Sequence, residues 1–414
     1  MKRVTKGLLV VGLSLLVFLA GCGSGDEESE GADGSVTLEM FSNKSESIDT
    51  YKGIIEDFES ENPNINIELE APPEAETVLK TRLTKNDLPD IMSIGGNATY
   101  GELASSEVFH DFSGSDVLDS VQPSYIDMLS RLVGPDKEEV YGIPYATNAN
   151  GVIYNKQKVK ELGIEIPTDW DEFIQALETA KAAGEIPIYF TLQDAWTGMP
   201  IWNGVAANLV PKDFAQLKNN GEATFQEEYN DVASKMLELL NYGHSDNFGI
   251  GYADGNRAFA NGEGVFYIQG NWAIPEILEM NPDIELGTMA LPSNNNAEEN
   301  DLVSGVDVAL TISDSTEHKE EAMKFIKYLA SEEVAQRYIN EQKAFSGLTG
   351  VLQKDPVFDG IKKYFEQGRL TSFPDHYYPA GLGTENLVQD FLIEKNKDAF
   401  LETMDSEWDK VLNR

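Results

Sequence analysis

The chain has few of the residues on which disulfides and metal sites depend. Its 414 residues include one cysteine, Cys22, and four histidines. A single cysteine cannot form an intramolecular disulfide and cannot supply a zinc site built on cysteine pairs. The histidines, His110, His244, His318 and His376, stand far apart and form no HExxH pattern. The sequence therefore offers no basis for metalloprotease chemistry, and we expect no metal and no cofactor.

Positive charge is also scarce. Lys and Arg number 31 against 71 Asp and Glu, which gives a formal net charge of −40. A surface of this kind repels a phosphate backbone before contact, so nucleic acid is excluded as a partner. Salt screens such charges within about 8 Å at physiological ionic strength. We therefore expect the protein to work in an external, salty or alkaline medium.

Motifs for phosphate binding and nucleophilic catalysis are missing as well. The sequence contains no GxSxG, no GxxxxGK[ST] and no GxGxxG before a helix, and Gly95-Gly96 is too short a signal for a phosphate cradle. It shows no repeat with a fixed period, which excludes a solenoid or a propeller. What remains is a globular composition, 41% hydrophobic and 25% charged, with length for two or three domains.

The N-terminus has the pattern of an export signal. Three basic residues precede an apolar run from Leu8 to Ala20, which is shorter than the roughly 20 residues of a membrane span. We predict a signal peptide over 1–21. Residues 22–35 have no large apolar side chain and should form a disordered acidic tether.

Leu19-Ala20-Gly21-Cys22 resembles the bacterial lipobox, in which the cysteine thiol receives a diacylglycerol and becomes the new N-terminus. The resemblance implies a lipid anchor on Cys22 and a location at the extracellular face of the cell membrane. Cleavage before Cys22 removes three basic residues and no acid, which leaves a net charge of −43.

After the tether, β and helical patterns alternate. A strand pattern at 36–41 is followed by helical spacing from Ile48 to Phe58, and the order strand, helix, strand continues at 65–69, 74–85 and 90–94. This order predicts a mainly parallel sheet flanked by helices, with ligands at the carboxyl ends of its strands. Further along we expect strands at 151–154, 186–190 and 306–312, helices at 168–180, 229–241 and 272–280, a loop at 292–300, and two helices within 316–340. Thr168 is the expected N-cap of the first of these helices.

Several segments together resemble the family 1 extracellular solute-binding proteins, the maltose-binding-protein-like sugar-binding subunits of bacterial ABC importers. The segments follow the family's order, although none is specific alone. They are Phe58 with Asn62-Pro63-Asn64-Ile65, Pro89-Asp90-Ile91, Ile143-Pro144-Tyr145, Ile153-Tyr154-Asn155-Lys156, Trp170-Asp171-Glu172-Phe173, Phe259 with Asn261-Gly262, Gly270-Asn271-Trp272, Leu291-Pro292, and Ala322 with Phe325-Ile326 and Leu329. The family's usual pattern is broken at Glu263-Gly264-Val265.

The resemblance implies a periplasmic-binding-protein fold, with two α/β lobes and a ligand cleft between them. The implied ranges are 36–145 plus 305–341 for lobe one, 149–290 plus 349–414 for lobe two, and 145–149, 290–304 and 341–348 for the crossing segments. It also implies a membrane permease as a partner, and we expect a monomer.

A sugar presents hydroxyl groups around its rim and patches of C–H on its faces. Hydroxyl groups pair with amides and carboxylates, and C–H patches pack on aromatic rings. The cleft loops implied by the resemblance carry such mixtures. We expect ligand contacts from Phe41, Asn43, Asn97, Tyr145, Asn148, Asp194, Trp196, Gln269, Asn271, Trp272, Asp307, Tyr377 and Tyr378. Asn43 and Asn97 also suit turns, and Asp307 also suits a strand end.

Other functions stay open at this point. A secreted glycoside hydrolase needs two carboxylates, but 71 acidic residues make candidate pairs uninformative. Tyr377 and Tyr378 are adjacent, as in ferric-ion-binding proteins of the same fold, and phenolate oxygens suit iron(III). A purely structural surface lipoprotein is the third alternative. Among the tryptophans, Trp170 and Trp408 are expected in the core, while Trp272 is expected to be the main aromatic platform.

The Cys22→Ser variant tests the lipid anchor. Because Cys22 is the only thiol and follows the apolar run directly, its loss should release the protein into the medium or leave an unprocessed precursor. Membrane fractionation with mass analysis of the N-terminus distinguishes these products from the wild type. A variant that is processed and retained like the wild type would contradict the lipoprotein assignment.

Overall fold

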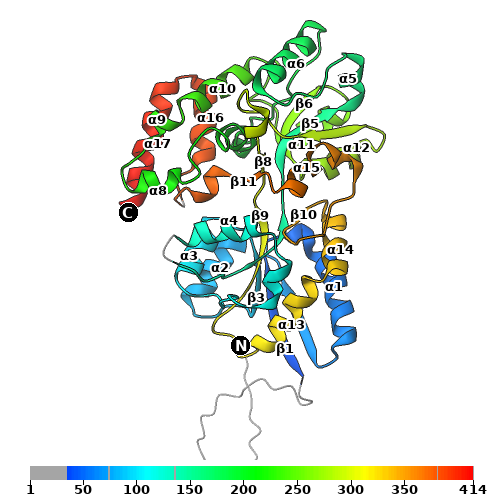
Figure 1. Cartoon of the computed structure of the whole chain (residues 1–414), viewed down its shortest axis with the longest axis vertical. Coiled ribbons are helices and arrows are strands. Elements are labelled where there is room, and N and C mark those ends of the chain that lie inside the picture. Colours follow the sequence, from blue (N-terminus) through cyan, green and yellow to red (C-terminus); the bar gives the residue numbers. More distant parts are fainter. Residues whose placement is uncertain (1–34, 73–74, 135–136, 380, 414) are drawn as a thin grey trace, which may run out of the picture.

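The protein consists of two lobes stacked along its long axis, each built on its own β-sheet (Figure 1). The computed structural model describes residues 35–72, 75–134, 137–379 and 381–413, so the predicted signal peptide, Cys22 and almost all of the tether lie outside the described residues. The described part contains no helix that is both long and apolar enough to cross a membrane. The predicted two-lobe α/β fold is confirmed.

The first sheet has the strand order β10-β4-β9-β3-β1-β2. Its N-terminal half follows the predicted pattern, because β1 lies between β2 and β3 and pairs with both in parallel. The helix after β1 buries Tyr51, Ile54, Ile55 and Phe58 against the sheet, as their helical spacing predicts. The bounds in this half are β1 Val36–Ser42, α1 Ile48–Glu61, β2 Ile65–Glu70, α2 Ala75–Thr84, β3 Ile91–Ile94, α3 Ala98–Ser105 and α4 Pro123–Val133.

The other half of this sheet is antiparallel, which corrects the prediction of a mainly parallel sheet. β9 pairs antiparallel with β3 and with β4, and β10 pairs antiparallel with β4. The reason is the path of the chain, since β4 leads toward the second lobe and β9 leads back from it. The bounds are β4 Ile143–Thr147, β9 Val306–Ile312, α13 Lys319–Leu329, α14 Glu332–Gln342 and β10 Phe345–Ser346.

The second sheet has the order β11-β8-β5-β6, with β7 also paired to β5. β5 is buried along its whole length and runs antiparallel to β6, β7 and β8, while β11 and β8 are parallel. The strands are β5 Asn150–Asn155, β6 Phe266–Gly270, β7 Leu286–Met289, β8 Leu302–Val303 and β11 Leu370–Thr371. The helices are α5 Lys156–Glu161, α6 Trp170–Ala182, α7 Met199–Ala206, α8 Phe214–Asn219, α9 Phe225–Glu228, α10 Asn230–Leu240, α11 Tyr252–Ala260, α12 Ala273–Met280, α15 Asp359–Gln367, α16 Thr384–Glu394 and α17 Lys397–Leu412.

Two local predictions in this lobe are wrong. The segment 186–190 forms only a single bridge between Ile188 and Phe266, because Pro187 has no N–H and the N–H of Ile188 donates to the Tyr242 carbonyl. The N-cap of α6 is Asp169, whose carboxylate accepts from the Glu172 N–H at 2.9 Å. The predicted cap, Thr168, instead donates its N–H and hydroxyl to the Glu172 carboxylate at 2.9 and 3.0 Å.

The chain passes between the lobes at three places. Asn148 and Ala149 connect β4 to β5, and Ser304 and Gly305 connect β8 to β9. The second passage is narrower than the predicted 290–304, since β8 already belongs to the second sheet. The third lies after the predicted 341–348, because β10 pairs with β4 and the chain reaches the second lobe near Val357, whose carbonyl accepts from the Thr288 hydroxyl.

Many of the large aromatic residues of the second lobe pack into one core, where Trp170 and Trp408 lie as predicted. Trp170 is 5% exposed, and the Lys235 ammonium lies 3.7 Å from the centre of its ring. Trp202 stacks on Tyr229 at 4.9 Å.

Replacing Trp170 with alanine should lower the free energy of unfolding by about 3–5 kcal/mol, the cost of a cavity in place of a buried aromatic side chain. Urea denaturation measures the change. Trp196→Ala is the matched control, because Trp196 is 39% exposed and its loss should cost far less. Equal losses for the two variants would contradict the assignment of Trp170 to the core.

Candidate ligand-binding cleft

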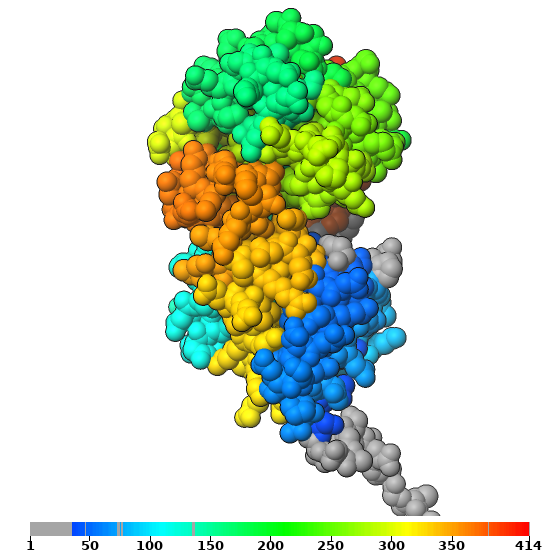
Figure 2. Space-filling view, turned by 90° about the vertical axis from the view of Figure 1, so that its right-hand side faces the viewer, coloured from blue at the N-terminus to red at the C-terminus, as the bar shows by residue number. Residues whose placement is uncertain are grey.

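The strand ends of the first lobe point toward the second lobe, where the surface is hollowed. β1, β3 and β4 all end at the side of the sheet from which the chain crosses over. In Figure 2 the outline is indented on the right, between the blue elements of the first lobe and the green elements of the second. A groove of about 910 Å³ lies between α3 and α4 of the first lobe and α8 and α17 of the second.

On the first lobe, three predicted residues converge on Gly95. A Cβ atom at Gly95 would lie 3.5 Å from the Asn97 amide nitrogen, 3.7 Å from the Asn43 side-chain amide group and 3.9 Å from the Asp307 carbonyl oxygen. The Asn97 side chain also caps α3, accepting from the N–H groups of Thr99 and Tyr100 at 3.0 and 3.3 Å. The loops after β1 and β3 and the start of β9 thus bring polar groups together from distant parts of the sequence.

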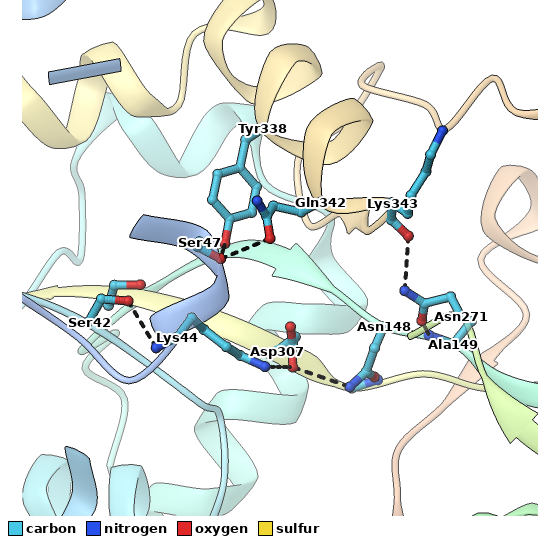
Figure 3. A network of polar contacts seen from close by, with 12 residues as sticks. Ser42, Lys44, Ser47, Asn148, Ala149, Asn271, Asp307, Tyr338, Gln342 and Lys343 are labelled. Carbon is cyan, nitrogen blue, oxygen red and sulfur yellow. Dashed lines mark hydrogen bonds and ion pairs between the residues drawn. The ribbon is translucent and has the colours of Figure 1, made fainter. Parts of the chain in front are cut away.

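A charged residue that the sequence reasoning missed completes this wall. The Lys44 ammonium lies 2.8 Å from the Asp307 carboxylate, and the Asn148 amide donates to the same oxygen at 3.5 Å (Figure 3). The signal was present in the sequence, since Lys44 follows Asn43 directly in a chain poor in cations. The two opposite charges make this part of the wall close to neutral.

Two predicted asparagines lie at the crossing segments. The Asn148 N–H donates to the Gly305 carbonyl at 3.1 Å, and its side-chain oxygen accepts from the Gly305 N–H at 3.1 Å. The Asn271 side-chain oxygen accepts from the Ala149 N–H at 2.8 Å, and its amide nitrogen donates to the Lys343 carbonyl at 3.0 Å. Both side chains therefore join backbone segments to each other.

On the second lobe, Trp272 stands at the start of α12 with its ring half-buried. Its indole N–H donates to the side-chain oxygen of Gln269, which is itself buried, at 3.2 Å. The ring packs directly on Gly270, where an added Cβ would lie 2.0 Å from the nearest ring carbon. Gln269 therefore positions the ring, and Gly270 gives it room.

Trp196 and Asp194 both contact Tyr252, which was not among the predicted site residues. The rings of Trp196 and Tyr252 have centroids 4.9 Å apart, and the Asp194 carboxylate accepts from the Tyr252 N–H at 2.7 Å. Burial raises the pKa of Tyr252 to about 12, so its hydroxyl stays protonated and remains a donor. Tyr252 follows two glycines in a turn-like stretch, and that pattern does not distinguish a wall residue from a loop residue.

Three predicted site residues are buried in cores, and one of them, Tyr378, also lines the groove between the lobes. Phe41 and Tyr145 are 0% and 1% exposed in the first lobe, and the Tyr145 ring lies 4.9 Å from that of Tyr338. Tyr378 is 4% exposed in the second lobe and donates to the Tyr229 hydroxyl at 2.5 Å. Their aromatic type fits a sugar platform and a core equally well, and the core provides the larger apolar contact.

Tyr377 connects the two lobes beside the groove. Its hydroxyl donates to the Met128 carbonyl at 3.4 Å, and the Arg131 guanidinium lies 5.4 Å from its ring centre. The hydroxyls of Tyr377 and Tyr378 thus have different partners, and the pair does not present two phenolates to one ion. Among the described residues, no group of three His, Cys, Asp or Glu side chains is placed to hold a metal. The geometry disfavours the ferric-ion alternative.

Two α/β lobes, each built on its own sheet and joined by three passages with a groove between them, define the class of two-lobe solute-binding proteins. The family model described as bacterial extracellular solute-binding protein matches residues 44–336, and the chain belongs to this family. The expected family membership is confirmed.

Individual relatives are similar over most of the chain. The multiple sugar-binding protein of Streptococcus mutans is 32% identical over 359 residues, which cover 83% of both chains. The melibiose/raffinose/stachyose-binding protein MelE of Bacillus subtilis is 24% identical over 388 residues, which cover 91% of this chain and 89% of MelE. The apo form of RafE from Streptococcus pneumoniae is 27% identical, with a TM-score of 0.78 over 92% of this chain and 99% of RafE. RafE in complex with raffinose is 28% identical, with a TM-score of 0.75 over 91% of this chain and 100% of RafE.

Gly270→Ala should displace the Trp272 ring, because the new methyl group would overlap it. We expect the free energy of unfolding to fall by about 1–3 kcal/mol, as for other overpacking changes. In a Trp272→Ala background the same change should cost almost nothing, since the overlapping ring is gone. Urea denaturation of the two single variants and the double variant measures this coupling, and equal costs in both backgrounds would show that the ring does not pack on Gly270.

Proposed function

We propose that this chain is the extracytoplasmic carbohydrate-binding subunit of an ABC importer. It captures a sugar or a short oligosaccharide between its lobes and delivers it to a membrane permease. The observation that carries this proposal is the pairing of two unlike walls. Amides of Asn43 and Asn97 stand at the strand ends of one lobe, and Trp272 and Trp196 belong to the other. This is the mixture that the rim and the faces of a sugar require.

The charge of the cleft supports an uncharged ligand. Lys44 is paired with Asp307 at 2.8 Å, so this wall offers donors and acceptors without a net charge. A chain with a net charge of −40 also repels anions over its whole surface. The names of the relatives and the raffinose complex of RafE agree with a sugar ligand.

The carboxylates near the walls favour binding over hydrolysis. A glycosidase needs one carboxyl group to donate a proton and a second to act as nucleophile or base. Here Asp307 is held by Lys44 and Asn148, and Asp194 accepts from the Tyr252 N–H. Each holds a neighbouring group in place. We therefore propose that the sugar leaves unchanged and that the protein is not an enzyme, which chromatography of the ligand after incubation tests directly.

The family is extracellular. How this chain is held at the cell surface is part of the proposal. Cys22 would anchor the chain at the outer face of the cell membrane by a lipid, with residues 23–35 as a spacer. The protein would act as a monomer that presents its closed, loaded form to the permease. Closure of both walls on the sugar is what would distinguish loaded from empty protein.

A thermal-shift screen with raffinose, stachyose, melibiose and maltose tests the function. A ligand that binds only the folded protein adds about 2.7 kcal/mol at 100 times its Kd, so one of these sugars should raise the Tm clearly. In Trp272→Ala we expect sugar affinity to fall at least ~10-fold, because an aromatic platform buries apolar area on both partners. Calorimetric titration measures the affinities.

Trp170→Ala serves as the control, because it should lower stability while leaving sugar affinity unchanged. No Tm shift with any of the sugars would count against the proposed ligand class. A normal affinity in Trp272→Ala, together with a large loss of stability, would show that Trp272 is a packing residue.

A further inference from the structure

One side chain of the second lobe contacts both the first passage between the lobes and a residue of the first lobe. Asn271 lies at the end of β6 in the second lobe and is 8% exposed. Its amide contacts the first passage at Ala149 and the end of α14 in the first lobe at Lys343 (Figure 3). An N–H can only donate and a carbonyl can only accept, so these two partners fix the orientation of the amide. Both polar ends of the side chain are used.

Lys343 connects Asn271 to the third passage. It follows α14 with a φ of 51°, a left-handed conformation that a lysine keeps only where its surroundings hold it. Its carbonyl accepts from Asn271, and its ammonium lies 3.1 Å from the Asp355 carboxylate. Asp355 in turn accepts from the Val357 N–H at 3.1 Å, where the chain enters the second lobe. Lys343 thus contacts Asn271 through its carbonyl and, through its ammonium and Asp355, the point where the third passage enters the second lobe.

Asn271 is also the residue before Trp272, the proposed sugar platform. Its own N–H donates to the Ala149 carbonyl at 3.0 Å, so two hydrogen bonds fix it to the first passage. A shift of Trp272 therefore moves the backbone unit that contacts both Ala149 and Lys343. The sugar wall and the interlobe contact share one peptide segment.

We propose that Asn271 is a positioning residue that sets the angle between the lobes and couples it to the sugar platform. Sequence reasoning assigned Asn271 to direct ligand contact, but its burial and its two backbone partners leave its amide occupied between the lobes. In this role it tunes sugar affinity through the energy of closure. The part of the inference that concerns affinity rests on the proposed sugar-binding function.

The decisive variant is Asn271→Asp. It keeps the oxygen that accepts from Ala149 and replaces the donor to Lys343 by an oxygen that faces a carbonyl. Asn281→Asp is the matched control, because Asn281 donates to the Ala260 carbonyl at 2.7 Å and accepts from the Asp283 N–H at 3.1 Å, within the second lobe. Asn271→Ser, whose hydroxyl is too short to reach both partners, is a second variant in case the aspartate variant does not fold.

The first readout needs no sugar. Small-angle scattering of the full chain should give a larger radius of gyration for Asn271→Asp than for the wild type and Asn281→Asp. Hydrogen exchange should accelerate in peptides covering 343–355. With a sugar found by the thermal-shift screen, closure should still occur, but affinity should fall ~5-fold or more in Asn271→Asp and stay unchanged in Asn281→Asp.

Two results would overturn the proposal. Equal scattering and exchange in Asn271→Asp and Asn281→Asp would show that the contact does not set the lobe angle. A loss of affinity with unchanged scattering and exchange would assign Asn271 to direct sugar contact. If the wild type binds no sugar, the proposed function fails by itself, and the sugar-free measurements still decide the role of Asn271.

Discussion

Two hydrogen bonds between Asn148 and Gly305 join the first two passages into one ribbon. This ribbon connects the two lobes. The Asn148 backbone N–H and side-chain oxygen both bond to Gly305. Glycine is required there because a Cβ would lie 2.9 Å from a Phe373 ring carbon and 3.2 Å from His376. Two residues beyond Gly305, Asp307 holds Lys44 at the wall of the cleft. The position of that wall thus follows from the ribbon.

The walls on either side of the ribbon have different physical tasks. On the first lobe, Asn43 and Asn97 are held by strand ends and a helix cap, so their amides are ordered before any ligand arrives. On the second lobe, Trp272 is braced by Gln269 and supported on Gly270. Ordered groups lose little conformational freedom on binding.

Much of the fold follows from patterns along the sequence, whereas most of the site depends on distant partners. Apolar periodicity locates α1 because this helix buries one face, and a strand end locates Asn43. The same periodicity does not distinguish Phe41, a core residue, from a cleft residue two positions away, since both are buried or half-buried. Asn271 takes its role from Lys343, which is 72 residues away, and no local pattern carries that contact.

The place of β9 in the first sheet determines when that lobe can fold. β9 lies between β3 and β4 in the sheet. β3 and β4 are complete by residue 147, whereas β9 consists of residues 306–312. During synthesis the sheet therefore lacks its middle strand until most of the chain has left the ribosome, and closing so long a loop is slow. The first lobe therefore cannot complete its sheet until residue 312 has been made. Because the chain enters the second lobe and returns before β9 forms, completion of the first lobe depends on the synthesis of most of the second.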